Sequence, residues 1–187
     1  MEGTNMTTNE KVLAFATKAH EGQMRKSTGT PMIQHPIRVA KTLEEAGFAP
    51  EVVYAGFLHD VAEDTIYTLE DIAQEFGQKV ADIVAGNTED KTKSWEERKQ
   101  HTIDWIKEAP LEIKALIVAD KLDNLRSLVE DYQTVGDELW THFKRGKEKQ
   151  KWYFTSVAEN ATIGLEQSKI PAFFHVYSAL VQSFFGE

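Results

Sequence analysis

Four ionisable side chains interrupt or end an apolar run in the stretch Phe57-Leu58-His59-Asp60-Val61-Ala62-Glu63-Asp64-Thr65. If the stretch is helical, His59 and Glu63 share one face, because residues four apart lie one above the other. Asp60 and Asp64 share the neighbouring face by the same spacing. Charged groups at a buried helix end are costly unless a partner compensates them, and a metal ion is such a partner for adjacent His and Asp. The alternative is a helix that reaches the surface at His59 and ends in solvated acids.

Length and charge limit the kinds of protein this chain can be. We expect its 187 residues to form one domain over 1–187, with enough sequence for a sizeable core. The formal net charge of −9 argues against nucleic acid or an anionic membrane surface as the main partner. A small anionic ligand is compatible with this charge, because it needs only local cations or a metal ion.

The sequence contains no cysteine, which excludes disulfide bonds, zinc–thiolate sites and cysteine nucleophiles. A metal site must therefore use histidine, carboxylate, carbonyl or water ligands. Residues 1–10 are polar and lack the apolar core of a signal peptide, and no apolar run approaches the length of a membrane span. We expect a cytoplasmic protein without a membrane partner.

Apolar residues recur at helical spacing along most of the chain, beginning with a segment from about residue 8 to residue 21. Two helix starts carry a capping box, formed by Thr68 with Asp71 and by Ser94 with Glu97. Alternating strand patterns are absent from the sequence. These patterns predict an all-α fold with about eight to ten helices.

Prolines mark the start of two helices that carry candidate ligands. Pro36 fits the first position of a helix, which places His35 at or just before the helix start. Pro50 opens the helix predicted to carry His59 and Asp60. A lone histidine before a proline is usually structural, so His35 gains weight as a ligand only if other ligands exist.

The segment from Leu111 to about residue 130 is predicted to be a central helix, because apolar residues cover most of its sides. Its apolar face continues into Asp120 and Asn124, which should lie on one line in the interior. Buried polar side chains need partners, so Asp120 in mid-helix is a candidate functional residue. A buried hydrogen bond is the alternative.

Cations gather in three places on a chain that is otherwise acidic. Arg25 and Lys26 are adjacent on a loop, two lysines lie within residues 91–93, and a basic segment spans residues 144–151. Each group could contact an anionic ligand. The alternatives are a solvated pair on the loop and a charged helix surface in the basic segment.

The candidate ligands are two imidazoles and two carboxylates from three predicted helices: His35, His59, Asp60 and Asp120. Such a set can hold one divalent cation and leave positions open for water and substrate. Zn²⁺, Mn²⁺ and Fe²⁺ are all chemically admissible.

The pattern His35…His59-Asp60…Asp120 resembles the H…HD…D signature of the HD-domain metal-dependent phosphohydrolases. The surrounding sequences resemble the hydrolase domain of the Rel/SpoT stringent-response enzymes and the free-standing small alarmone hydrolases, which include a metazoan SpoT homologue. The segments that carry this resemblance are 19–26, 35–40, 58–65 and 119–126. It extends over residues 8 to 160, which is most of the chain.

The resemblance implies an all-helical HD fold that binds one divalent metal ion, usually Mn²⁺. It implies hydrolysis of the 3′-diphosphate of guanosine tetra- or pentaphosphate, giving GDP or GTP and pyrophosphate. By motif position, the metal ligands are His35, His59, Asp60 and Asp120. Glu63 and Asp64 match the pair that positions or deprotonates the attacking water.

The resemblance also assigns the residues that contact the nucleotide. These are Arg25, Lys26 and Ser27 on the loop, Asn124 and Ser127 after the metal Asp, and Lys149 and Tyr153 in the basic segment. Three features depart from the family pattern. Met32 replaces a common Tyr, and Asp123 stands where the long enzymes often have His. Thr28 makes the loop from Arg25 to His35 one residue longer than in many long enzymes, a length that the short forms share.

Two other functions are compatible with the same residues. One is an HD phosphohydrolase that acts on a nucleoside monophosphate, a dNTP or NADPH, since one fold can host several substrates. The other is a non-catalytic HD domain that senses a nucleotide. The intact ligands and the Glu63-Asp64 pair argue against a sensor, which has no need of both. The sequence leaves open whether the chain forms a homo-oligomer.

Overall fold

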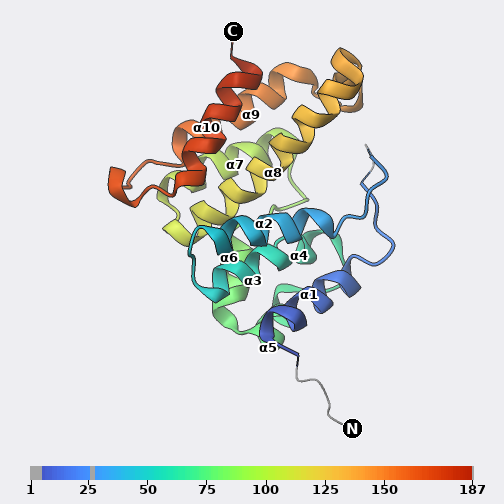
Figure 1. Cartoon of the computed structure of the whole chain (residues 1–187), viewed down its shortest axis with the longest axis vertical. Helices are drawn as coiled ribbons and strands as arrows, with labels where there is room; N and C mark the ends of the chain where they lie inside the picture. The colour runs from blue at the N-terminus through green and yellow to red at the C-terminus, as the bar shows by residue number, and fades with distance from the viewer. Residues whose placement is uncertain (1–5, 26–27, 187) are drawn as a thin grey trace. The chain divides into compact units, whose positions relative to one another are not determined.

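The computed structural model describes residues 6–25 and 28–186, and within them every extended regular element is a helix (Figure 1). Ten α-helices and two 3₁₀ helices are present in these ranges, so the predicted all-α class is confirmed. Pairing of the β type is limited there to one isolated bridge between Met24 and Pro31. In the same part of the chain, no helix combines the length and apolar character needed to cross a membrane.

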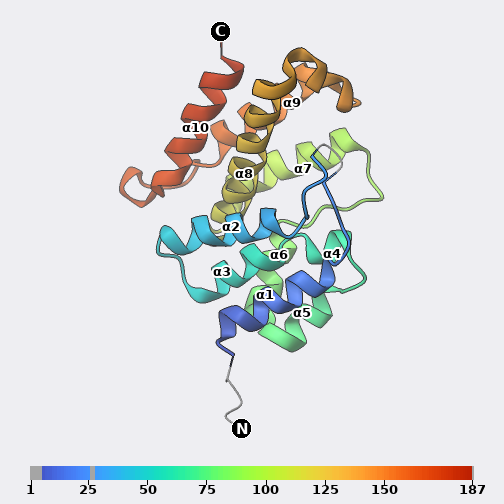
Figure 2. The same ribbon diagram turned by 45° about the vertical axis from the view of Figure 1, so that its right-hand side comes forward.

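The chain divides into two compact units, Met1–Thr88 and Glu89–Glu187. The helices of the first unit are α1 (Thr8–Ala19), α2 (Gln34–Glu45), α3 (Pro50–Leu58), α4 (Val61–Asp64), α5 (Leu69–Phe76) and α6 (Gln78–Gly86). Helix α3 is the central one, because it packs against α1, α2 and α6 (Figure 2). Helices α5 and α6 also pack against each other.

Capping boxes define several helix starts as the sequence predicts. The Thr68 side chain accepts a hydrogen bond from the Asp71 N–H, and Asp71 Oδ2 accepts one from the Thr68 N–H at 2.8 Å. Ser94 and Glu97 form the second predicted box. A third box, between Thr7 and Glu10 at the start of α1, escaped the sequence analysis.

The secondary structure in the centre of the stretch 57–65 differs from the prediction. Helix α3 ends at Leu58 and α4 begins at Val61, so His59 and Asp60 lie between two helices and the prediction of one helix through both is wrong. The His59 ring donates from Nδ1 to the Gly56 carbonyl at 2.8 Å. In a continuous helix that carbonyl would accept the N–H of Asp60. A side-chain donor thus competes with the backbone at the end of α3.

The second unit is built around two long helices. Its elements are α7 (Trp95–Glu108), α8 (Leu111–Val135), η1 (Gly136–His142), α9 (Gly146–Asn160), η2 (Gln167–Lys169) and α10 (Ala172–Phe185). Helix α9 packs against α7, α8 and α10, and α8 packs against α7, α10 and η1. Apolar residues from Ala115 to Leu125 are buried around α8, which confirms its prediction as a central helix. It continues past the predicted end and stops before Gly136, which has a φ of 63°.

A buried lysine joins three segments of the second unit. Lys114 on α8 is 3% exposed, and its ammonium group donates to the carbonyls of Ile106 and Lys107 at the end of α7. It also donates to the Ile163 carbonyl at 2.9 Å. Carbonyls at a helix end lack intrahelical donors, so Lys114 caps α7 and fixes the segment after α9.

We expect Lys114→Met to lower the free energy of unfolding by about 3 kcal/mol, because buried carbonyls lose their charged donor. Denaturant unfolding of the purified protein measures this change. Lys107→Met is the matched control, since the Lys107 side chain lies in an exposed pair with Asp104 at 3.3 Å. We expect the control to change stability by less than about 1 kcal/mol. Equal effects of the two substitutions would contradict the capping role.

Candidate functional site

His35 lies in the first turn of α2 and its side chain is 3% exposed. The prediction that Pro36 opens the helix is wrong by two residues, because α2 starts at Gln34 and Pro36 is its third residue. The first helical backbone bond runs from the Ile37 N–H to the Ile33 carbonyl at 3.2 Å. A proline this close to a helix start loses no intrahelical bond, since the first four N–H groups have no acceptor in the helix.

The hydrogen bond of His59 determines which ring nitrogen is available as a ligand. A carbonyl oxygen can only accept, so the bond from Nδ1 to Gly56 places the proton on Nδ1. The Nε2 atom then carries a lone pair, which is the form of imidazole that binds metals. His59 is 1% exposed, and metal-ligating histidines are commonly oriented by such a backbone bond.

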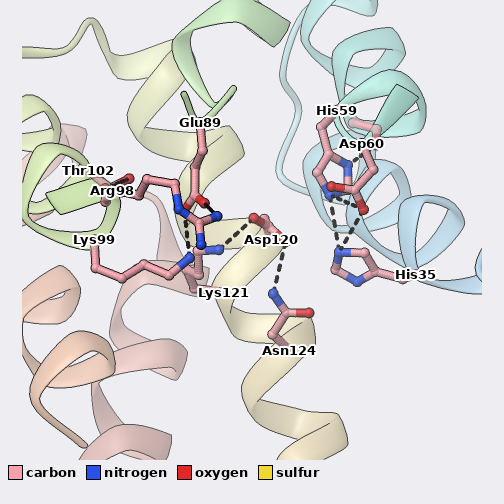
Figure 3. A network of polar contacts seen from close by, with 11 residues as sticks. His35, His59, Asp60, Glu89, Arg98, Lys99, Thr102, Asp120, Lys121 and Asn124 are labelled. Carbon is pink, nitrogen blue, oxygen red and sulfur yellow. Dashed lines mark hydrogen bonds and ion pairs between the residues drawn. The ribbon is translucent and has the colours of Figure 1, made fainter. Parts of the chain in front are cut away.

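Three donor atoms converge in the first unit, as Figure 3 shows. His59 Nε2 lies 3.1 Å from His35 Nε2 and 3.3 Å from Asp60 Oδ2, and His35 Nε2 lies 3.8 Å from the same carboxylate oxygen. Ligands bound to one ion at about 2.0–2.2 Å are about 3–3.5 Å apart. Two of the three separations fall in that range. The donor set therefore fits one face of a divalent-cation site.

Gly56 sets the distance between the two histidine-bearing segments. A Cβ atom at Gly56 would lie 2.9 Å from Ala40 Cα and 3.0 Å from Leu43 Cδ1, both on α2. Helices α2 and α3 can therefore approach this closely only without a side chain at position 56. The sequence analysis did not single out Gly56. A glycine inside an apolar helical run is the signal that could have found it.

Glu63 and Asp64 lie on α4, one turn after Asp60, as predicted. The Asp64 N–H donates to the Asp60 carbonyl at 3.0 Å, so this turn is hydrogen-bonded directly to the candidate ligand's backbone. Glu63 is half-buried and the Asp64 side chain is exposed. The role of this pair in activating water stays a prediction.

The loop after α1 carries the first predicted nucleotide contacts. Lys26 and Ser27 lie outside the described residues. Arg25 is half-buried, and its N–H donates to the Thr30 carbonyl at 2.8 Å. Its own carbonyl accepts from the Gly29 N–H at 2.8 Å, so Arg25 sits at the base of a closed turn.

Asp120 is in the middle of α8 in the second unit and is 6% exposed. Asn124 donates from Nδ2 to Asp120 Oδ1 at 3.1 Å, and Lys121 Nζ lies 3.0 Å from Oδ2. Each carboxylate oxygen therefore has a partner on α8. Asp120 is buried as predicted, and Asn124 lies on the same face of α8, but Asn124 is half-buried rather than interior.

Lys121 is held between Asp120 and an aromatic ring. Its Nζ lies 5.5 Å from the centroid of the Tyr153 ring, a cation–π distance. Burial opposes the charge of Lys121. The nearby Asp120, Tyr153 and Glu89 outweigh that effect and raise the pKa of Lys121 well above its usual value. The ammonium is therefore charged beside Asp120 at neutral pH.

A polar network continues from this ring and was missed by the sequence analysis. Lys99 lies 5.0 Å from the Tyr153 ring centroid. It also lies 2.6 Å from Glu89, which pairs with Arg98 at 2.9 Å (Figure 3). Burial and the cation Lys121 lower the pKa of Lys99 despite its pairing with Glu89. Burial also raises the pKa of Tyr153. No local sequence motif predicts this network, because its members come from a loop and three helices.

The remaining predicted nucleotide contacts differ in exposure. Asn124 and Ser127 are half-buried and lie, with Asp120, on one face of α8 by their spacing. Lys149 on α9 is exposed, with its Nζ 5.5 Å from the Trp152 ring centroid. Tyr153 is 3% exposed. Their contact with a nucleotide stays a prediction.

Residues 12–149 match the family model described as HD domain. The chain belongs to the HD domain family. The match includes His35, His59, Asp60 and Asp120, and the HD domain implies binding of a divalent metal ion. The recognition of an HD domain from the H…HD…D pattern is thereby confirmed.

Several relatives of this HD domain are named enzymes of guanosine nucleotide metabolism. A guanosine-3′,5′-bis(diphosphate) 3′-pyrophosphohydrolase of Danio rerio is 41% identical over 117 residues, which cover 61% of this chain and 65% of that protein. The Homo sapiens protein of the same name is 43% identical over the same shares. The match to a GTP pyrophosphokinase of Streptomyces coelicolor is 37% identical and covers 68% of this chain but only 16% of that protein. The chain thus matches less than two thirds of the length of these relatives.

Two solved structures resemble the HD domain over most of its length. A protein of Listeria monocytogenes EGD-e is 52% identical with a TM-score of 0.79, covering 82% of this chain and 99% of that one. A metazoan orthologue of SpoT, described as hydrolysing ppGpp, is 28% identical with the same TM-score of 0.79. The alignment covers 98% of this chain and 99% of the metazoan one.

Proposed function

We propose that this HD domain is a metal-dependent 3′-pyrophosphohydrolase of guanosine tetra- and pentaphosphate. The convergence of His35 Nε2, His59 Nε2 and Asp60 Oδ2 is the observation that carries the proposal. The activities of the Danio rerio and metazoan relatives support this substrate. Hydrolysis gives GDP or GTP and pyrophosphate.

We propose that residues 1–187 act as one domain and that Asp120 completes the ligand set. The family match supports this, because it runs from residue 12 to residue 149 and so includes residues of both units. The burial of Asp120 at 6% exposure and its pairing with Lys121 are compatible with a role as a ligand. Mn²⁺ is the ion we propose, since imidazole and carboxylate ligands suit it.

The residues of the first unit have distinct parts in the proposed reaction. When bound, the ion supplies a polarised phosphoryl oxygen and a water of lowered pKa. His35, His59 and Asp60 hold the ion, and the Gly56 carbonyl keeps the His59 ring in the ligating tautomer. Glu63 or Asp64 accepts the proton of the attacking water. The water oxygen bonds to the phosphorus attached to the ribose 3′-oxygen as the bond between that phosphorus and the 3′-oxygen breaks. The 3′-oxygen takes a proton from solvent to become a hydroxyl group, and pyrophosphate is released.

Cations and polar groups bind the nucleotide in this proposal. Arg25, Lys26 and Ser27 contact it from the loop, and Asn124, Ser127, Lys149 and Tyr153 contact it from α8 and α9. Cations beside the phosphates offset the substrate's negative charge. The nucleotide is the partner we propose, and nucleic acid is not expected with a net charge of −9. We also propose that the protein acts in the cytoplasm.

A substrate panel with Mn²⁺ tests the proposal. Purified protein is incubated with ppGpp, a nucleoside monophosphate, a dNTP and NADPH, and orthophosphate and pyrophosphate are detected separately. We expect GDP and pyrophosphate in equal amounts from ppGpp. Release of orthophosphate from another nucleotide would instead favour an HD phosphohydrolase that acts on that nucleotide. Tight binding without turnover would favour a sensor.

Substitution of the acidic pair separates catalysis from metal binding. We expect Glu63→Gln and Asp64→Asn to lower kcat, with the larger loss, about 10²–10⁴-fold, at the residue that takes the proton. Mn²⁺ affinity, measured by calorimetry, should stay within a few-fold, because neither carboxylate belongs to the proposed ligand set. Glu70→Gln, on the exposed face of α5, is the control. Unchanged kcat in both variants would contradict a role for the pair.

A further inference from the structure

Gln23 connects two parts of the first unit that lie far apart in the sequence. Its Nε2 donates to the Asp64 carbonyl at 2.7 Å, across 41 positions of the chain. Its backbone carbonyl accepts from the Met32 N–H at 3.0 Å, just before α2. One residue is therefore bonded to the end of α4 and to the segment that leads into His35.

The orientation of the Gln23 amide is fixed by both of its side-chain bonds. Because Nε2 donates to a carbonyl, Oε1 is the acceptor and faces His20 Nδ1 at 2.9 Å. His20 thus carries its proton on Nδ1. His20 is 3% exposed, and its Nε2 has no hydrogen-bond partner among the residues that the structure describes. The buried imidazole serves as a fixed donor that holds the Gln23 side chain in place.

Helix α4 needs such an anchor because it is a single turn of four residues. Isolated helices of this length are unstable in water, since nucleation is unfavourable and too few hydrogen bonds form to offset its cost. The turn holds Glu63 and Asp64, and its backbone bonds are Asp64 N–H to Asp60 and Thr65 N–H to Val61, at 3.0 and 3.1 Å. The Gln23 bond to the Asp64 carbonyl adds a tie to another segment of the unit.

We propose that Gln23 is a positioning residue that holds α4, and with it the Glu63-Asp64 pair, in the geometry that hydrolysis requires. This inference rests on the proposed function for its catalytic part. His20 supports Gln23 through the bond from its Nδ1 to Gln23 Oε1. Without the hydrogen bond from Gln23 to the Asp64 carbonyl, α4 opens more often. Glu63 and Asp64 then spend less time beside the attacking water.

Two variants separate the bonds of Gln23. Gln23→Leu removes both side-chain bonds at similar size. Gln23→Glu keeps an acceptor for His20 Nδ1 but cannot donate to the Asp64 carbonyl when ionised. Gln74→Leu is the matched control, because Gln74 is exposed on α5 of the same unit. Hydrogen exchange of the Asp64 and Thr65 amides, Mn²⁺ affinity and steady-state kinetics are measured for each.

We expect both Gln23 variants to exchange these two amides at least about 10-fold faster, since local opening governs exchange. We expect kcat to fall about 10- to 100-fold, because small misplacements of catalytic groups slow the reaction by such factors. KM and Mn²⁺ affinity should stay within about threefold of the wild-type values. The control should match the wild type in every measurement. A general structural role would instead lower metal affinity and raise KM together.

The outcomes separate this inference from the proposed function. Unchanged exchange or unchanged kcat in Gln23→Leu, in an enzyme that hydrolyses ppGpp, overturns the inference and leaves the function standing. A wild-type protein without hydrolysis overturns the function and the catalytic part of the inference. Faster exchange in that case still supports Gln23 as the anchor of α4. A Gln23→Glu variant that behaves like the wild type overturns the assignment of the Asp64 bond.

Discussion

Asp60→Asn is expected to abolish metal-dependent hydrolysis, with kcat/KM lower by at least about 10³-fold, or about 4 kcal/mol of transition-state stabilisation. The substitution keeps the size of the side chain but removes the charge beside His59 Nε2, which lies 3.3 Å from Asp60 Oδ2. A neutral amide is a weak partner for a divalent cation. We also expect Mn²⁺ to raise the melting temperature of the wild type and to leave that of the variant nearly unchanged, because stabilisation by a ligand requires binding.

The matched control for this substitution is Asp82→Asn on α6 of the same unit. Asp82 is exposed and accepts a hydrogen bond from Gln78 at 2.8 Å. We expect wild-type hydrolysis and a wild-type response to Mn²⁺ from this control. Full metal-induced stabilisation of Asp60→Asn would contradict the donor set. Lost turnover with retained Mn²⁺ binding would move Asp60 from metal ligand to another role.

The elements that could be predicted are those set by local sequence. The capping boxes at Thr68 and Ser94 have their partners three residues away, so both were predicted correctly. The interior position of Asp120 followed from the apolar rows of α8, which continue past it. These signals are local because backbone bonds and helical faces repeat within a few residues.

The other features that escaped prediction depend on side-chain orientation or on tertiary contacts. The break between α3 and α4 coincides with the bond from His59 Nδ1 to the Gly56 carbonyl, an orientation that helical periodicity does not encode. The link from Gln23 to Asp64 and the network around Lys121 join segments distant in sequence. Pattern and propensity cannot supply such contacts, because they carry no information about which faces meet.

The family resemblance identified the four candidate ligands as one set, which their spacing alone could not do. Spacings of 24 and 60 residues between the HD pair and the other candidate ligands are not specific. The H…HD…D pattern made them a recognisable set, and the family match over residues 12–149 confirms the membership. The geometry then adds what the motif lacks: a tautomer for His59 and a reason for the short distance to His35.

Gly56→Ala is the second large effect that we expect, and its sign is opposite to that of helix propensity. Propensity alone predicts a gain of about 1 kcal/mol for Ala over Gly inside a helix. The added Cβ, however, would lie 2.9 Å from Ala40 Cα, a backbone atom that cannot rotate away. Overpacking of this kind costs about 1–3 kcal/mol. We therefore expect denaturant unfolding to show a lower free energy of unfolding for Gly56→Ala, because the clash with Ala40 outweighs the gain in helix propensity.

The same substitution should weaken the metal site more than it weakens the fold. Separating α2 from α3 moves His35 away from His59, whose Nε2 atoms are 3.1 Å apart. We expect Mn²⁺ affinity to fall about 10- to 100-fold, as it does when the support of a metal ligand is disturbed. Ala14→Val, on the exposed face of α1, is the control for added methyl groups. A stabilised Gly56→Ala variant with wild-type Mn²⁺ affinity would show that α2 and α3 can separate without cost, and would contradict the role of Gly56 in setting the distance between the two histidines.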